Sequence, residues 1–285
     1  MLTRTRVEVV PMTPHIGAEI RGIDLREKPD DETVRLIYQA WLDHLVIVFP
    51  GQDLSQEDLI RATGYFGSLG HIDRPLKYRP PGFARMLPGI MLISNIRENG
   101  EPIGVLPDGE MQFHHDMIHK EVPSRATMLF AVDIPTFGGD TLFASGYAAY
   151  ETLDRAVRDR LEGKWALHHY NYGSTIKGDD RGSEAFGECT HPVFRTHEET
   201  GRKAVYVNRL MTVKVLDMPA DESERLLGAV YDHAEKPEFV YQHRWRKGDL
   251  LLWDNRCSSH ARTDFPADQK RLLLRTTIEG TTRPY

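Results

Sequence analysis

Met111-Gln112-Phe113-His114-His115-Asp116-Met117 is the stretch around which this chain is organised. Side chains of an extended segment alternate between its two sides, so the imidazole of His114 and the carboxylate of Asp116 point the same way. Two histidines and one carboxylate on one face of a metal ion leave adjacent positions open on ferrous iron. The pair therefore predicts two ligands of one metal, and His260 is the best candidate for the third.

The composition is that of an ordinary globular protein, with 285 residues, 27% of them charged and 40% hydrophobic. No apolar run approaches the ~20 residues of a membrane span, and Met1–Arg6 is not followed by the apolar segment of a secretory signal. Cys189 and Cys257 lack metal-type or redox-type spacing, which fits a reducing compartment. We therefore expect a cytoplasmic protein without a membrane partner. The net charge of −6 without a dense Lys/Arg block argues against a nucleic-acid partner.

Short strands dominate the hydrophobic pattern. An apolar stripe from Val34 to Leu42 predicts one helix, Ser55–Asp58 is typical of the start of a second, and further helices are expected at 147–161 and after Asp221. Strands are expected at 7–10, 18–23, 45–49, 90–94, 126–132, 165–170, 240–245, 250–253 and 271–278, and after the glycine turn at 138–139. Without a repeat or a linker, residues 1–285 are predicted to form a single domain, mainly β with flanking helices, as a sandwich or barrel.

Two long segments lack a regular pattern. Residues 70–107 are rich in Pro, Gly and Arg, and residues 173–188 are polar. Long irregular segments inside a compact domain are usually functional. We expect the first segment to cover a substrate pocket and the second to be another loop or lid.

The last predicted strand carries two arginines on one face. Arg271 and Arg275 alternate with Leu272 and Leu274. If the arginine face looks inward, it needs an anion, because an unpaired buried charge costs several kcal/mol. If the leucine face forms the core, the arginines are solvated, and the strand by itself favours this second arrangement.

Four motifs, in their order and spacing, resemble the taurine dioxygenase (TauD/TfdA) family of iron- and 2-oxoglutarate-dependent dioxygenases. They are His114-x-Asp116, the Gly138-Gly139-Asp140-Thr141 turn, Trp253-Asp254-Asn255-Arg256 followed by His260, and Arg271 with Arg275. The resemblance runs from about Val7 to the C-terminus. It implies a double-stranded β-helix (a cupin-like jelly roll) with the metal at one mouth, in a chain that forms dimers or tetramers.

The resemblance also implies a role for each matching position. His114, Asp116 and His260 would bind Fe(II), and Arg271 with Thr141 would hold the distal carboxylate of 2-oxoglutarate. Two neutral imidazoles and one carboxylate leave positions for 2-oxoglutarate and O₂. The expected reaction couples oxidative decarboxylation of 2-oxoglutarate, to succinate and CO₂, with hydroxylation of a substrate.

The substrate is expected to be a small anionic organic molecule. Arg275 matches the family position that meets the substrate anion, and His71 falls near a substrate-contacting region. Around the first ligand the sequence departs from the taurine enzyme: Phe113 replaces a tryptophan, His115 a small hydroxylic residue, and Glu110 an amine-binding asparagine. Glu110 is thus a further candidate for substrate contact. We expect a carboxylate or sulfonate other than taurine.

Three other functions could be built around the same three predicted ligands. A divalent-metal hydrolase or lyase needs a general base beside the metal and has no use for Arg271 or Thr141. A sensor of small acids on the same fold needs no turnover. A related oxygenase would desaturate or epoxidise a natural-product acid, and the sequence does not separate that outcome from hydroxylation.

Overall fold

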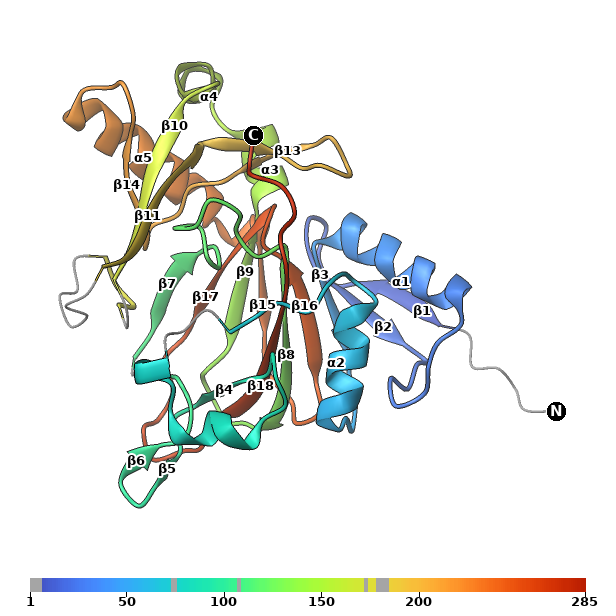
Figure 1. The fold of residues 1–285 in the computed structure, drawn as a ribbon. Coiled ribbons are helices and arrows are strands. Elements are labelled where there is room, and N and C mark those ends of the chain that lie inside the picture. Colours follow the sequence, from blue (N-terminus) through green and yellow to red (C-terminus); the bar gives the residue numbers. More distant parts are fainter. Residues whose placement is uncertain (1–6, 73–75, 107–108, 172–173, 178–184) are drawn as a thin grey trace.

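Two β-sheets that face each other form the body of the molecule, with helices on the outside (Figure 1). The computed structural model describes residues 7–72, 76–106, 109–171, 174–177 and 185–285. In these residues the larger sheet has seven strands, in the order β1 (Glu8–Pro11), β2 (Ala18–Arg21), β3 (Val46–Phe49), β16 (Leu250–Asp254), β8 (Ala126–Asp133), β18 (Leu272–Ile278) and β4 (Met91–Ser94). The smaller sheet has the order β15 (Val240–His243), β9 (Thr141–Ser145), β17 (Ser258–Arg262) and β7 (Met111–His114).

Strand β16 shows why the larger sheet lies at the centre. All five of its residues are buried, and it pairs with β3 on one side and β8 on the other. Leu250 and Leu252 belong to the core cluster shared with α1 (Asp31–His44) and α2 (Gln56–Gly64), whereas Leu251 and Trp253 pack towards Phe143 of β9. A strand covered on both faces is a continuous apolar run instead of an alternating one.

The two N-terminal helices begin at the positions that the sequence predicts. Asp30 accepts a hydrogen bond from the Thr33 backbone N–H at the start of α1. Ser55 and Asp58 form a reciprocal capping box at the start of α2. Both helices lie against the larger sheet on the side away from the smaller one (Figure 1).

The single helix predicted at 147–161 is wrong, because the structure has two helices there. Helix α3 (Gly146–Thr152) ends at Leu153, which is extended, and α4 (Arg155–Leu161) follows. The Asp154 carboxylate accepts hydrogen bonds from the Ala156 and Val157 backbone N–H groups. An aspartate in this position starts a new helix, and the hydrophobic period alone does not reveal the break.

The predicted loop at 173–188 is also shorter than expected. Strand β11 (Ala185–Pro192) begins inside it and pairs with β10 (Trp165–Asn171), which in turn pairs with β14 (Thr212–Val215). Sheet pairing overrides the polar composition of this stretch. The rest of the predicted loop, apart from residues 174–177, lies outside the described residues. This region is completed by β12 (Phe194–Thr196), β13 (Lys203–Val205) and α5 (Ala220–Ala234).

The segment 70–107 contains more regular structure than the one strand predicted in it. Besides β4 it holds two short 3₁₀ helices, Leu76–Tyr78 and Pro81–Arg85, and the hairpin of β5 (Arg97–Glu98) and β6 (Glu101–Pro102). Residues 73–75 and 107 are outside the described part. Within the described residues, no helix has both the length and the apolar character that a membrane span requires.

Candidate active site

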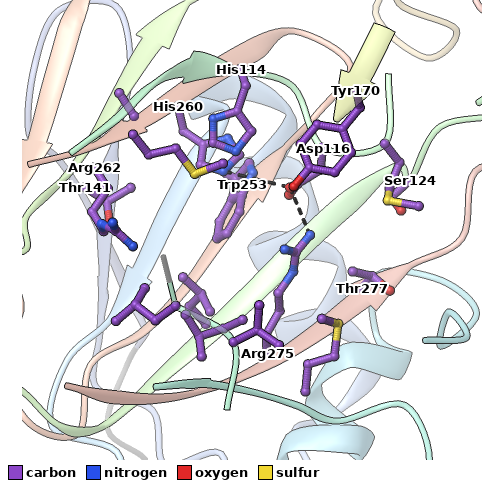
Figure 2. Close-up of a pocket in the computed structure, with 18 of the residues that line it drawn as sticks. His114, Asp116, Ser124, Thr141, Tyr170, Trp253, His260, Arg262, Arg275 and Thr277 are labelled. Atoms are coloured by element: carbon purple, nitrogen blue, oxygen red, sulfur yellow. Dashed lines mark ion pairs between the residues drawn. The ribbon is translucent and has the colours of Figure 1, made fainter. Parts of the chain in front are cut away.

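A cavity of about 250 Å³ lies between the two sheets and is lined by residues of both. Strand β7 and strand β17 are neighbours in the smaller sheet, and their register places His114 opposite His260. Asp116 follows β7 by two residues. The potential ligand atoms of His114, Asp116 and His260 all lie within 4.8 Å of one another. The three side chains that the sequence predicts as ligands therefore meet at one point of the cavity wall (Figure 2).

Neighbouring groups fix the orientation of two ligands. Nδ1 of His114 lies 2.9 Å from the carbonyl oxygen of Gln112. Because a carbonyl only accepts, Nδ1 carries the proton and Nε2 keeps its lone pair for a metal. Thr127 donates a hydrogen bond of 2.7 Å to Oδ2 of Asp116 and accepts one of 3.0 Å from Asn255. This Asn255–Thr127–Asp116 chain holds the carboxylate in place.

Aromatic rings hold the third ligand. The ring of His260 lies 4.7 Å from Trp253 and 6.0 Å from Phe143, measured between ring centroids. Its Nε2 is directed to Asp116, 3.9 Å from Oδ1, and its Nδ1 has no hydrogen-bond partner among the described residues. Trp253 thus lies beside the predicted metal position.

Burial sets the charges of the three ligands. Desolvation lowers the pKa of His114, and it lowers the pKa of His260 well below the ordinary value. Burial opposes ionisation of Asp116, but the positive charge of Arg275, helped by the hydrogen bond from Thr127, outweighs it and holds the pKa of Asp116 below its usual range. Two neutral imidazoles and one carboxylate are the protonation states that a divalent metal requires. The donor set therefore fits Fe(II).

Arg275 forms an ion pair with the Asp116 carboxylate. Its Nη2 lies 2.9 Å from Oδ1 of Asp116, so Asp116 stands between His260 and Arg275 (Figure 2). Both Arg271 and Arg275 line the cavity. The expectation, drawn from the strand alone, that the arginine face is solvated is wrong. Leu274 packs with the helix-covered cluster on the opposite face, so both faces of β18 are covered.

Arg271 forms a buried cationic pocket with Thr141. The Arg271 side chain is one of the largest fully buried ones, and its Nη2 donates to the Gly139 carbonyl at 3.3 Å. Its Nε has no hydrogen-bond partner among the described residues. The Thr141 hydroxyl oxygen accepts from Trp245 Nε1 at 3.0 Å, so its own proton can be donated elsewhere. A donor-rich, dry pocket of this kind suits a carboxylate.

Burial and the neighbouring Arg262 together lower the pKa of Arg271 to about 9. The guanidinium is therefore still charged at neutral pH. A cation whose pKa is depressed in this way gains from any anion that enters the pocket, because the anion restores the stabilisation that water supplied before burial.

The positions of His71 and Glu110 support a contact with substrate less well than the position of Arg275 does. His71 lines the cavity, but its side chain is 93% exposed and lies 3.7 Å from Glu279. Glu110 is exposed just before β7 and is absent from the described lining of the cavity. Its position gives the predicted substrate contact no support.

Sequence reasoning missed several residues at this site. Arg262 lies two positions after His260 in β17, so the period of a strand places it on the same face, a signal that the sequence does contain. Thr127 and Asn255 gave no such signal, because their partners are distant in sequence. The apolar wall was also missed, and it includes Met91, Met111, Met117, Leu129, Tyr170 and Met211.

A second buried group has similar composition. His197, Asp254 and Cys257, here called the brace cluster, also hold their potential ligand atoms within 4.8 Å of one another. Asp254 accepts from Nε and Nη2 of Arg256, at 2.8 and 2.6 Å, and its Oδ2 lies 3.1 Å from Nε2 of His197. The carboxylate is thus already bonded to cationic and N–H groups, which leaves little for a metal.

The fold and the cavity define a mainly β protein in which a His-Asp-His group that could hold a metal ion lies beside a buried cationic pocket. The family described as taurine catabolism dioxygenase TauD, TfdA family matches residues 8–277. The chain belongs to this family of 2-oxoglutarate-dependent dioxygenases.

Individual relatives match over nearly the full length. The chain is 34% identical over 279 residues to the alpha-ketoglutarate-dependent 2,4-dichlorophenoxyacetate dioxygenase of Cupriavidus pinatubonensis, which covers 94% of this chain and 96% of the relative. It is also 34% identical over 277 residues to pentalenolactone F synthase of Streptomyces avermitilis, covering 90% and 89%. Among solved structures, a taurine dioxygenase from Burkholderia xenovorans superposes with a TM-score of 0.79 at 30% identity, covering 98% and 92%.

Proposed function

We propose that the chain is an Fe(II)- and 2-oxoglutarate-dependent dioxygenase with a jelly-roll core, which hydroxylates a small monoanionic substrate that has an apolar body. One observation carries the proposal: the cavity that holds His114, Asp116 and His260 also holds two separate arginines on one face of one strand. Arg271 and Arg275 are four residues apart, about 13 Å along an extended chain. The site therefore offers two places for anions around one metal position.

Arg271 and Thr141 would hold the distal carboxylate of 2-oxoglutarate. Among the described residues the Arg271 Nε has no hydrogen-bond partner, and the Thr141 hydroxyl has a proton to donate. Each hydrogen bond to a charged group contributes about 1.5–3 kcal/mol. A divalent-metal hydrolase would leave this pocket without a use, which favours the oxygenase.

His114, Asp116 and His260 would hold the iron. When bound, iron supplies the chemistry by which 2-oxoglutarate and O₂ become succinate and CO₂ while one oxygen atom enters a substrate C–H bond. The protein contributes orientation: Gln112 fixes the tautomer of His114, and Thr127 fixes the carboxylate of Asp116. The apolar wall would limit the access of bulk water to the reacting carbon.

Arg275 would meet the substrate anion, and the methionine-rich wall would contact the apolar body. Asp116 is the sole acidic side chain among the described residues that line the cavity, and it serves as a metal ligand. The described lining thus offers no free carboxylate for the ammonium group of taurine. Val105 and Leu106 of the 70–107 segment belong to the apolar lining, which supports a covering role for that segment.

A second outcome on the same iron site is desaturation or epoxidation of an acid. The chain is as similar to a relative named as a synthase as it is to the dichlorophenoxyacetate enzyme, with 34% identity to each. This equal similarity supports desaturation or epoxidation as a second candidate reaction. The residues proposed to bind iron and 2-oxoglutarate would be the same in both.

An anaerobic titration tests the proposal. Metal-free protein receives Fe(II) and then 2-oxoglutarate, while the visible charge-transfer band of a chelated keto acid is followed. We expect a band in the wild type, none in His260→Ala, and a higher half-saturating concentration of 2-oxoglutarate in Arg271→Ala. A wild-type protein that binds iron without developing the band would overturn the proposal.

The substrate class is tested by succinate release in air with matched compounds. Phenoxyacetate should stimulate release, whereas neutral phenoxyethanol and zwitterionic taurine should not, and Arg275→Gln should remove the preference for the anion. Product analysis by mass then separates an added oxygen atom from a loss of two hydrogens. Equal stimulation by phenoxyethanol would exclude a substrate anion.

A further inference from the structure

His115 lies between two predicted iron ligands in the sequence, but its side chain makes a different contact. His114 and Asp116 both line the cavity, whereas His115 is absent from the described lining. The His115 side chain is buried, and its Nδ1 lies 3.2 Å from Nδ2 of Asn208, which is also buried. This contact joins the end of β7 to the segment 208–212, where β14 begins.

The bonds of Asn208 fix the direction of this hydrogen bond. Its Oδ1 accepts from the Met211 backbone N–H at 2.8 Å, so the amide presents Nδ2 to His115. Because Nδ2 can only donate, Nδ1 of His115 is the acceptor and carries no proton. The Asn208 side chain is thereby bonded on both sides, to the imidazole and to the backbone of Met211.

A backbone hydrogen bond supports the same connection. Leu210 donates from its N–H to the carbonyl oxygen of Phe113 at 3.2 Å, and Phe113 directly precedes His114 in β7. The end of β7 is therefore bonded to the segment 208–212 at two points. Of the two, the bond from His115 is made by side chains and can be removed by substitution.

Met211 is the residue of this segment that a substrate would meet. It lines the cavity and belongs to a buried apolar cluster with Ile118 and Leu210. Met111 and Tyr170, which also line the cavity, pack against that cluster. A methionine side chain is flexible, so its place depends on how firmly its backbone is held. A displacement of the Met211 backbone would therefore change the shape of the apolar wall.

We propose that His115 and Asn208 form a positioning pair, which sets the place of Met211 relative to the predicted iron ligands and thereby limits the size of the apolar substrate body. The inference rests on the proposed function and adds a determinant of substrate size to it. The alternative is a role confined to supporting the metal ligands or the stability of the fold, and the experiment must exclude it.

Two anions with the same carboxymethyl ether group test the size limit. Phenoxyacetate carries one aromatic ring, and 2-naphthoxyacetate carries two fused rings. Each is titrated anaerobically into protein loaded with Fe(II) and 2-oxoglutarate, and the perturbation of the charge-transfer band gives its dissociation constant without turnover. The ratio of the constant for 2-naphthoxyacetate to that for phenoxyacetate is the size preference. The affinity for Fe(II) is measured separately, by competition with a chelator.

Five variants separate the roles. His115→Leu removes the acceptor, and His115→Asn keeps an acceptor near the position of Nδ1. Asn208→Ala breaks the pair from the other side, and Met211→Ala shortens the wall itself. His191→Leu is the matched control, because His191 is also a buried imidazole with one bonded nitrogen, in this case to the Lys120 carbonyl.

His115→Leu should lower the size preference roughly 2- to 10-fold, the range for one neutral hydrogen bond, and leave the affinity for Fe(II) unchanged. Asn208→Ala should lower it similarly, whereas His115→Asn and His191→Leu should keep the wild-type preference. Met211→Ala should lower the preference by itself. Adding His115→Leu to Met211→Ala should then have no further effect, because changes that act through one contact are not additive.

Two results would overturn the inference. A loss of Fe(II) affinity in His115→Leu with an unchanged size preference would show that His115 supports only the metal ligands. Additive effects of His115→Leu and Met211→Ala on the preference would show that the pair does not act through Met211. If His115→Leu does not fold, Asn208→Ala decides by the same measurements.

The proposed function fails with a different result. If the wild type gives no band with 2-oxoglutarate, or if neither anion perturbs the band, the proposed function is wrong and the inference falls with it. If the wild type responds to the anions and both His115→Leu and Asn208→Ala keep its size preference, the function stands and the positioning pair alone is refuted.

Discussion

His114, Asp116 and His260, here called the metal cluster because they could hold a metal ion, contain nearly the same chemical groups as the brace cluster, yet the bonding of the two clusters suits them to different tasks. In the brace cluster both nitrogens of His197 are in use, since Nε2 faces Asp254 and Nδ1 accepts from the backbone N–H groups of Glu199 and Thr200. In the metal cluster Nε2 of His114 and of His260 remain directed to the shared point. Proximity of ligand-type residues does not by itself make a metal site; uncommitted lone pairs do.

Cys257, the third member of the brace cluster, adds to the difference between the two clusters. Burial raises the pKa of the Cys257 thiol well above its ordinary value, and Asp254 adds to the effect. A thiol that stays protonated is a poor metal ligand. Arg256 fills the space beside Asp254 and also donates to Glu199 at 2.5 Å. The brace cluster thus acts as a buried ionic connection between β16 and the segment 197–200.

The largest expected effect is on stability, from Asp254→Asn. The substitution leaves Arg256 buried beside a neutral partner, and breaking a buried ion pair costs about 3–5 kcal/mol. Urea unfolding measures the loss. Metal binding by the folded variant should persist, because His114, Asp116 and His260 are unchanged.

Asp116→Asn is the matched control, since it makes the same chemical change in the other cluster. It should abolish metal binding and cost less stability than Asp254→Asn, because Asp116 pairs with a half-buried Arg275. If the two variants exchanged their effects, the assignment of the clusters would be reversed.

Acid is expected to act on the buried His191 before it acts on Asp254 of the brace cluster. Burial lowers the pKa of His191 from 6.5 to about 4. Between these values the unfolded chain binds a proton that the native state does not, so stability falls as the pH falls, by about 3 kcal/mol at pH 4. The pKa of Asp254 lies below its ordinary 3.8, so its contribution is retained above pH 3.8 and lost only in stronger acid.

Urea unfolding at pH 7, 6, 5 and 4 tests this difference. His191→Asn should reduce the slope of stability against pH, whereas Asp254→Asn should lower stability by a similar amount at pH 7 and pH 5. A slope between pH 7 and 5 that disappears in Asp254→Asn instead would mean that the brace cluster titrates in this range.

The metal cluster could be predicted from sequence because its signals are local. His114 and Asp116 are two residues apart in an extended segment, and His260, Arg271 and Arg275 follow motifs with family spacing. The inward direction of the arginine face could not be derived from the strand, because both faces of β18 are covered, one by helices and one by the cavity wall. Alternation shows that two faces differ, not which one is inside.

The residues that orient the ligands could not be predicted, for a different reason. Thr127 contacts Asp116 and Asn255 across strand pairings that no local pattern encodes. The start of β11 at Ala185 likewise depends on its pairing with β10. The mainly β fold class and the meeting of His114, Asp116 and His260 were thus accessible from the sequence, while tertiary partners required the structure.

Thr127→Val is expected to have an intermediate effect, confined to the metal cluster. The change keeps the shape of the side chain and removes the hydroxyl that donates to Asp116 and accepts from Asn255. Loss of such a supporting hydrogen bond typically weakens metal binding 10–100-fold. Competition with a chromophoric chelator measures the affinity. Thr200→Val, beside the brace cluster, should leave it unchanged, and equal affinities in Thr127→Val and the wild type would exclude the supporting role.

The smallest effect is expected from Cys257→Ala, which removes the thiol of the brace cluster. The side chain is buried, so losing it should cost about 1 kcal/mol of stability, comparable to one buried methylene group. Metal stoichiometry should stay at one ion per chain, because the protonated thiol and the fully bonded Asp254 offer no second site. Counting bound metal after dialysis in the wild type and in the variant measures this. A fall from two ions to one would show that the brace cluster binds metal after all. Asp254 would then exchange its hydrogen bonds for a metal ion, as we expect only of Asp116.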